Sequence, residues 1–167
     1  GEGVTGFYKQ LITQFSGKCA ISEDTLARYD LNIVSHMRKI NDKRDEPMVL
    51  KYFQYLSLLF VEYYLDEYFN NRQGLMDGLN SYVADFNAQY PNDAYEPYVE
   101  SDLNKIAVWN ATGSGKTLIM HVNFHQYLHY SGGRLPDDAT YILLTPKEGL
   151  SLQHIEDYTA SGISARI

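Results

Sequence analysis

Short apolar runs alternate with helical stretches in the last third of the chain, and this order restricts the possible folds more than any other feature. Residues 105–109, KIAVW, and 139–145, ATYILLT, have the length and apolar content of buried strands. The segment from Lys116 to about Tyr130, and the stretch GLSLQHIEDYT that begins at Gly149, are typical of helices. This order predicts an α/β fold with a parallel sheet and right-handed crossover connections.

The earlier part of the chain predicts helices only. Scattered apolar positions indicate a short helix near the start, and Ser22 followed by two acids marks the beginning of a second one. Residues 48–69 are apolar on nearly all sides, so we expect a helix that its neighbours bury. Another helix is expected through 75–86, and the polar stretch 89–102 with its two prolines indicates a loop.

A glycine-rich turn, NATGSGKT, joins the first apolar run to the next helix. Such a turn presents backbone N–H groups at the positive end of a helix, which is a concave site for anions. Gly113 and Gly115 allow backbone angles that a side chain forbids. Lys116 can reach terminal phosphates, and the Thr117 hydroxyl can ligate a magnesium ion. The pattern matches the signature GxxxxGK[ST] except that Asn110 replaces the first glycine.

The residues NATGSGKT resemble motif I of superfamily 2 helicases and translocases, and TPKEGLSLQH resembles motif Ia. Within this superfamily the chain is similar to the DEAD/DEAH-box-like helicase part of restriction and phage-defence enzymes, especially the restriction subunit of type III systems. The resemblance implies a mainly helical segment at 1–104 and, at 105–167, the incomplete first part of a RecA-like ATP-binding domain, a P-loop NTPase. It implies ATP and Mg²⁺ as cofactors, held by Thr112, Gly113, Ser114, Gly115, Lys116 and Thr117.

Two further sets of site residues follow from the resemblance. The stretch at 50–60, LKYFQYLSLLF, is similar to a segment whose glutamine contacts adenine, and Gln54 would take this role because a carboxamide both donates and accepts hydrogen bonds. The alternative is a polar residue on the thin stripe of a buried helix. Thr145, Pro146 and Lys147 would contact a nucleic-acid backbone, since ligands of parallel sheets gather where strands end. Pro146 ends the apolar run in either case.

Composition excludes several classes of protein. The net charge of −7 argues against a large nucleic-acid footprint on this chain alone, because phosphate contacts need Lys and Arg. Cys19 is the only cysteine, which favours an intracellular chain without disulfides. No secretory leader or bilayer-spanning apolar run occurs, so we expect a soluble, cytoplasmic protein without a membrane partner. The chain begins without Met and stops at Ser-Ala-Arg-Ile, which indicates a piece of a longer protein.

Three histidines, His121, His125 and His129, are spaced so that their rings could share one helix face. A zinc site would need further ligands, and the spacing lacks the glutamate of metalloprotease helices. We therefore interpret these residues as packed or surface histidines.

The favoured function is an ATP-dependent helicase or translocase that moves along DNA, with RNA less favoured, in a restriction or antiviral defence enzyme. Nuclease or methyltransferase subunits would be its partners. No apolar strand ending in Asp-Glu follows Thr145, so we expect the acid that holds magnesium to lie outside the chain, and the chain alone to be inactive. The alternatives are a P-loop ATPase or kinase of another class, and a non-catalytic interaction module with a vestigial loop.

Overall fold

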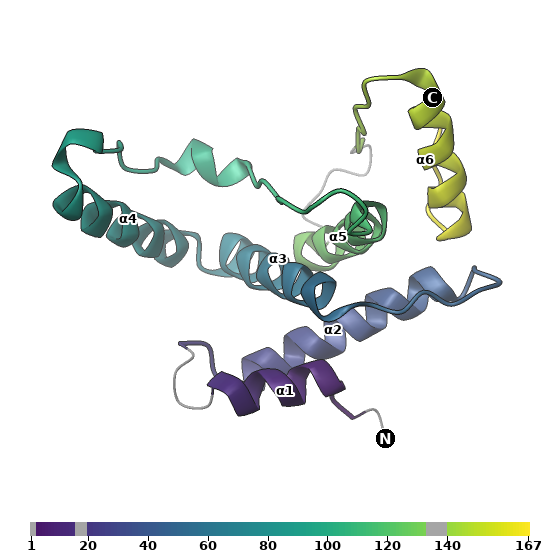
Figure 1. Cartoon of the computed structure of the whole chain (residues 1–167), viewed down its shortest axis with the longest axis horizontal. Coiled ribbons are helices and arrows are strands. Elements are labelled where there is room, and N and C mark those ends of the chain that lie inside the picture. The colour runs from purple at the N-terminus through teal and green to yellow at the C-terminus, as the bar shows by residue number, and fades with distance from the viewer. Residues whose placement is uncertain (1–2, 16–19, 133–139) are drawn as a thin grey trace.

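The computed structural model of the chain describes residues 3–15, 20–132 and 140–167, and every regular element in these ranges is a helix (Figure 1). The elements in chain order are α1 Gly6–Phe15, α2 Glu23–Asn41, α3 Tyr52–Asn70, α4 Arg72–Gln89, the 3₁₀ helices η1 Pro91–Asp93 and η2 Glu100–Asn104, α5 Lys116–Ser131 and α6 Glu148–Ala160. None of these helices combines the length and the apolar content that crossing a bilayer requires.

The predicted α/β fold is wrong, because the described residues form no strand and no parallel sheet of a RecA-like domain. Residues 105–109 and 140–145 adopt no regular structure, and Ala139 lies outside the described residues. An apolar run becomes a strand only when a neighbouring strand completes its backbone hydrogen bonds, and no such neighbour is present in the described ranges. Apolar side chains in both segments stay in solvent: Trp109 is 99% exposed and Leu144 88%.

The predicted helices are present, with shifted ends. Ser22 caps α2 as expected, since its Oγ accepts the Thr25 amide hydrogen bond at 3.2 Å. α3 begins at Tyr52 rather than Met48, because the Asn41 side chain holds Met48 in a non-helical conformation. Asn41 Nδ2 donates to the Met48 carbonyl at 3.0 Å, and its Oδ1 accepts the Met48 amide at 2.9 Å.

The core lies where α2, α3 and α5 pack against one another (Figure 1). Its buried members are Ile33, Met37, Ile40, Tyr55, Leu58, Leu118, Ile119 and Val122. The helix α1 covers α2 through a second apolar cluster, which includes Tyr8 and Tyr29. Residues on both sides of the expected boundary at 104 and 105 therefore contribute to one core, and the division into two domains stays a prediction.

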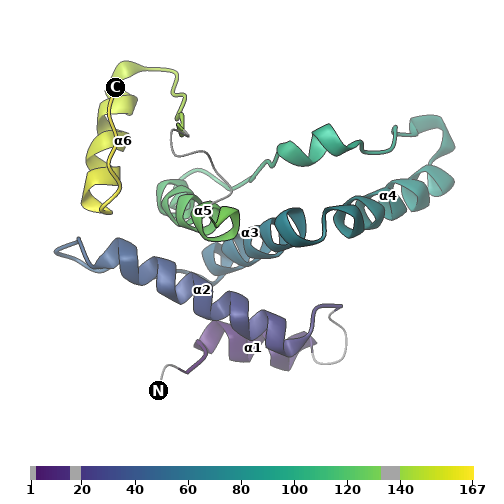
Figure 2. The same ribbon diagram turned by 180° about the vertical axis from the view of Figure 1, so that it is seen from behind.

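The helix α4 leaves this core and projects from it, as both views of the ribbon show (Figures 1 and 2). Leu75 is its only buried residue. The chain then returns along α4 through η1 and η2. At its base the return segment is anchored to α3, where the Tyr64 hydroxyl donates to the Leu103 carbonyl at 2.7 Å. We call residues 72–104 the arm.

Candidate functional site

The glycine-rich loop at residues 110–115 lies directly before α5. Gly113 has φ +75° and Gly115 has φ +79°, which is the left-handed region that glycine adopts without strain. The Ser114 amide donates to the Ala111 carbonyl at 3.2 Å and closes a tight turn. The two glycines thus adopt backbone angles that a residue with a side chain would disfavour.

The first turn of α5 is open to an anion. Its N-cap is Gly115, which has no side chain that could accept a hydrogen bond from the first amides of the helix. The amides of Lys116 and Thr117 have no preceding helical carbonyl as partner, and they lie at the positive end of the helix dipole. Gly115 and Lys116 are exposed, and Thr117 is half-buried. Backbone donors and a cation therefore meet at one accessible helix end.

The Lys116 side chain folds back over the loop. Its Nζ donates to the Ala111 carbonyl at 2.9 Å and to the Asn110 carbonyl at 3.3 Å. Both acceptors are neutral carbonyls, whereas a phosphate oxygen carries negative charge and attracts the ammonium of Lys116 more strongly. A phosphate oxygen can therefore replace these carbonyls as the partner of Lys116.

The loop rests on α3 through Gln54, which is 60 positions away in the sequence. Gln54 Nε2 donates to the Ser114 carbonyl at 2.8 Å, and its Oε1 accepts the Lys51 amide at 2.7 Å. The side chain is buried. The fold thus brings Gln54 and the loop together, although both ends of the carboxamide hold the backbone here, and a contact with adenine stays a prediction.

Sequence reasoning missed a second residue of α3 at the loop. The Ser57 hydroxyl donates to Asn110 Oδ1 at 3.3 Å. Ser57 follows Gln54 by three positions, so both side chains lie on one helix face. This spacing was the available signal, and it shows that α3 holds the loop near both of its ends. Ser114 Oγ, by contrast, is buried without a hydrogen-bond partner among the described residues.

The nucleotide cofactor fits the loop better than the metal does. Thr117 is the side-chain ligand that the motif offers to Mg²⁺, and residues 105–117 contain no carboxylate. Mg²⁺ keeps several waters and binds phosphate oxygens readily, so one hydroxyl is compatible with a metal that a nucleotide brings along. The described residues contain no group of three or more His, Cys, Asp or Glu that could hold a metal by itself.

The residues expected to contact nucleic acid lie at the start of α6. Thr145 Oγ1 donates to the Lys147 carbonyl at 3.1 Å and lies 2.5 Å from Ser151 Oγ. Pro146 and Lys147 are exposed. Within the described ranges, no hydrogen bond or ion pair connects these three residues to the loop, and their role in binding nucleic acid stays a prediction.

The three histidines of α5 differ in burial: His121 is buried, His125 is half-buried and His129 is exposed. His125 stacks on His36 of α2 with ring centroids 6.1 Å apart, and His129 meets the edge of the same ring at 5.8 Å. His121 stacks on Tyr158 at 4.3 Å. Burial lowers the pKa of His36 to about 3 and the pKa of His121 to about 4, so both rings are neutral at neutral pH.

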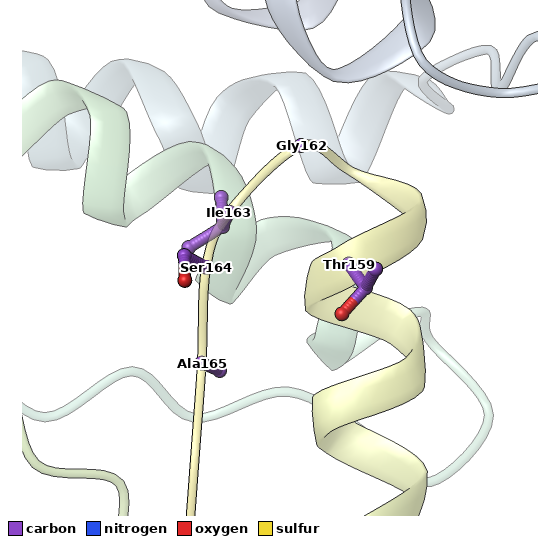
Figure 3. A pocket seen from close by; sticks show the side chains of 5 residues that line it. All are labelled: Thr159, Gly162, Ile163, Ser164 and Ala165. Atoms are coloured by element: carbon purple, nitrogen blue, oxygen red, sulfur yellow. The ribbon is translucent and has the colours of Figure 1, made fainter.

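A surface pocket of about 300 Å³ lies at the end of α6, where the chain turns at Gly162 and runs back beside the helix (Figure 3). Its lining residues are Thr159, Gly162, Ile163, Ser164 and Ala165. None of them is titratable, and none belongs to the loop. Comparison with known proteins adds no assignment, since no family model, curated protein or solved structure matches the chain.

Proposed function

We propose that the chain binds ATP at the loop and the first turn of α5, and that it belongs to an ATP-dependent helicase or translocase that moves along DNA. One observation carries the proposal. Two glycines with positive φ precede a helix whose first amides are uncapped, and a lysine stands at the same helix end. This combination suits the phosphate tail of a nucleotide.

The amides of the loop and of the first helical turn would donate to the phosphate oxygens. Lys116 would exchange the carbonyls of Asn110 and Ala111 for the β- and γ-phosphates, and Thr117 would ligate the Mg²⁺ that bridges them. Gln54 and Ser57 would keep the loop in place on α3 during this exchange. Contact with adenine is a further proposed role of Gln54.

Hydrolysis needs more than this loop. An acid must hold the metal, and another residue must orient the attacking water. Residues 105–117 supply neither group, so we propose that a longer protein supplies them. Movement along DNA, with contacts from Thr145, Pro146 and Lys147, and partners with nuclease or methyltransferase activity, are proposed from the resemblance to motifs I and Ia. A cytoplasmic location belongs to the same proposal.

Calorimetric titration of the chain with ATP, ADP and AMP tests the phosphate site. We expect affinity to fall in that order, because each phosphate removed takes away acceptors for the amides and Lys116. The variant Lys116→Ala should bind ATP about tenfold more weakly or worse, since it loses a charge-assisted hydrogen bond. Lys9→Ala on α1 removes the same charge from another exposed helical site and should bind as the wild type does.

Equal affinity for ATP and AMP, or equal loss in Lys116→Ala and Lys9→Ala, would contradict the phosphate site. The motor activity has a separate test, the ATPase rate of the longer protein with and without double-stranded DNA. We expect DNA to stimulate the rate and Lys116→Ala to abolish the stimulation. ATP binding without any stimulation by DNA or RNA would leave a nucleotide-binding protein but not a helicase.

A further inference from the structure

The arm has a composition unlike the rest of the chain. Residues 73–104 contain no Lys, Arg or His. They do contain acidic and aromatic residues: Asp77, Asp85, Asp93, Glu96, Glu100 and Asp102, and Tyr82, Phe86, Tyr90, Tyr95 and Tyr98. We propose that the arm is a docking surface for an arginine-rich segment of a partner protein. This inference does not depend on ATP binding.

The aromatic rings of the arm are unusually exposed. Tyr82 is 79% exposed and Tyr95 66%, and Tyr90 and Tyr98 are each 45% exposed. At the far end, the Phe86 ring lies 4.9 Å from Tyr90 and 5.3 Å from Tyr95, measured between centroids, so three rings form one patch. Exposed apolar patches rimmed by polar residues mark interaction sites in proteins.

Two asparagines hold this surface in a fixed shape. Asn80 Oδ1 accepts the Tyr98 amide at 2.7 Å, and its Nδ2 donates to the Tyr98 carbonyl at 3.1 Å. Asn87 forms the same pair of bonds with the backbone of Tyr95, both at 2.8 Å. The extended return segment is thereby fastened to α4 at two places. A surface that is ordered before binding loses less entropy when a partner docks.

The base of the arm already contains an arginine bound in the proposed way. The Arg72 guanidinium carbon lies 4.5 Å from the centroid of the Tyr68 ring, and Nη1 lies 3.3 Å from Glu100 Oε1. At the far end the same two kinds of group recur without a cation. Asp93 lies between Tyr90 and Tyr95 in sequence, and Glu96 directly follows Tyr95. Neither carboxylate has a hydrogen bond or ion pair with a described residue.

Charge complementarity selects the partner. The far end of the arm has carboxylates and no cation, so it repels the phosphates of nucleic acid and of anionic lipid. Exposed aromatic faces beside carboxylates attract cations, and guanidinium is preferred to ammonium because it is planar, stacks on rings and is weakly hydrated. An arginine-rich polypeptide supplies several such groups along one segment.

Fluorescence anisotropy with a labelled peptide of Arg-Gly repeats tests the proposal on the whole chain. We expect saturable binding, weaker binding of the Lys-Gly peptide and none of the Glu-Gly peptide. The double variant Asp93→Asn, Glu96→Gln and the double variant Tyr90→Leu, Tyr95→Leu should each weaken binding about fivefold. The matched controls are Asp45→Asn with Glu46→Gln, in the exposed turn after α2, and Phe60→Leu on α3, and both should bind as the wild type does.

A third variant separates charge from shape. Asn80→Ala with Asn87→Ala keeps every charge and ring but releases the return segment, and it should also weaken binding, while circular dichroism shows the helices intact. Three results would overturn the proposal: no saturable binding of the Arg-Gly peptide, equal losses in the arm variants and their controls, or arm-dependent binding of duplex DNA or anionic vesicles instead.

Discussion

Gln54 of the core helix α3 and Ser114 of the glycine-rich loop are joined by a hydrogen bond of 2.8 Å from Gln54 Nε2 to the Ser114 carbonyl. The loop is exposed over most of its length, while Gln54 is 94% covered, its exposed fraction being 6%. The bond therefore fixes the loop, which has few contacts of its own, relative to the core. A substitution of Gln54 should therefore also affect the loop.

Replacing Gln54 with Leu removes the donor to Ser114 and the acceptor for the Lys51 amide. A buried polar group left without its partner costs about 1–3 kcal/mol, so we expect the free energy of unfolding in urea to fall by that amount. ATP affinity should fall as well. Gln73→Leu, at an exposed site of α4, is the control and should change stability by less than about 0.5 kcal/mol. Similar losses in both variants would contradict a special role of Gln54.

The two loop glycines should differ in their tolerance of alanine. Both have positive φ, and a non-glycine residue there costs about 1–2 kcal/mol. A Cβ at position 115 would also lie 2.5 Å from Gln54 Nε2, whereas a Cβ at position 113 meets nothing within 4 Å. Gly115→Ala should therefore destabilise the protein more than Gly113→Ala, measured by urea unfolding.

A double-mutant cycle checks the cause of this difference. In a Gln54→Ala background the clash is gone, so the extra cost of Gly115→Ala should shrink toward the cost of Gly113→Ala. An unchanged difference between the two glycine variants would mean that Gln54 is not what restricts position 115.

Leu58 of α3 lies in the helical core, where it is fully buried among residues of α2, α3 and α5. Leu58→Ala should lower the free energy of unfolding by about 2–5 kcal/mol, because it removes buried methyl groups and leaves a cavity. Phe60→Ala, two positions away, removes a larger side chain that is 73% exposed and should cost less than about 0.5 kcal/mol. Equal costs would contradict the described packing of α3.

Acid should destabilise the fold through buried histidine. His121 is fully buried, its Nδ1 lies 2.8 Å from Ser161 Oγ, and burial followed by the charge of Arg44 lowers its pKa to about 4. In the unfolded chain its pKa is about 6.5, so the unfolded state binds the proton first. The contribution is therefore complete above pH 6.5 and is lost as the pH falls toward 4, by up to about 1.4 kcal/mol per pH unit.

Urea unfolding of the wild type and of His121→Gln between pH 7 and pH 5 measures this contribution. The variant should show the smaller dependence on pH, since glutamine does not titrate. Burial raises the pKa of Glu62, and this carboxyl contributes with the opposite sign, because its stabilisation is present in acid and lost as the pH rises. Comparing two proteins that both contain Glu62 removes its effect. Identical slopes would contradict the burial of a neutral His121.

The helices were predicted well because the residues that start and extend a helix are neighbours in the sequence. Ser22 and the acids after it are sufficient to start α2, and the spacing of apolar residues is sufficient to extend it. The strands at 105–109 and 139–145 were also predicted from a local pattern, their apolar content. A strand, however, depends on partner strands that are remote in sequence. Apolar content alone therefore gave the wrong fold class.

Contacts between side chains and distant backbone were beyond sequence reasoning for the same reason. The loop residues around Gly113 were recognised from their order, yet the position of Gln54 beneath them was supported only by a resemblance. Nothing in the spacing of Asn80 and Asn87 indicated that each would hold one residue of the returning chain. These asparagine–backbone pairs depend on how α4 and the return segment lie together. The local spacing of residues along the sequence does not reveal this arrangement.

The full exposure of Trp109 gives the protein a built-in optical probe. It is the only tryptophan in the chain, it is 99% exposed, and it stands directly before the first loop residue. Its indole is already surrounded by water in the folded state, so its emission should change little when the chain unfolds. A shift of that emission to shorter wavelength would instead signal that something has covered the approach to the loop.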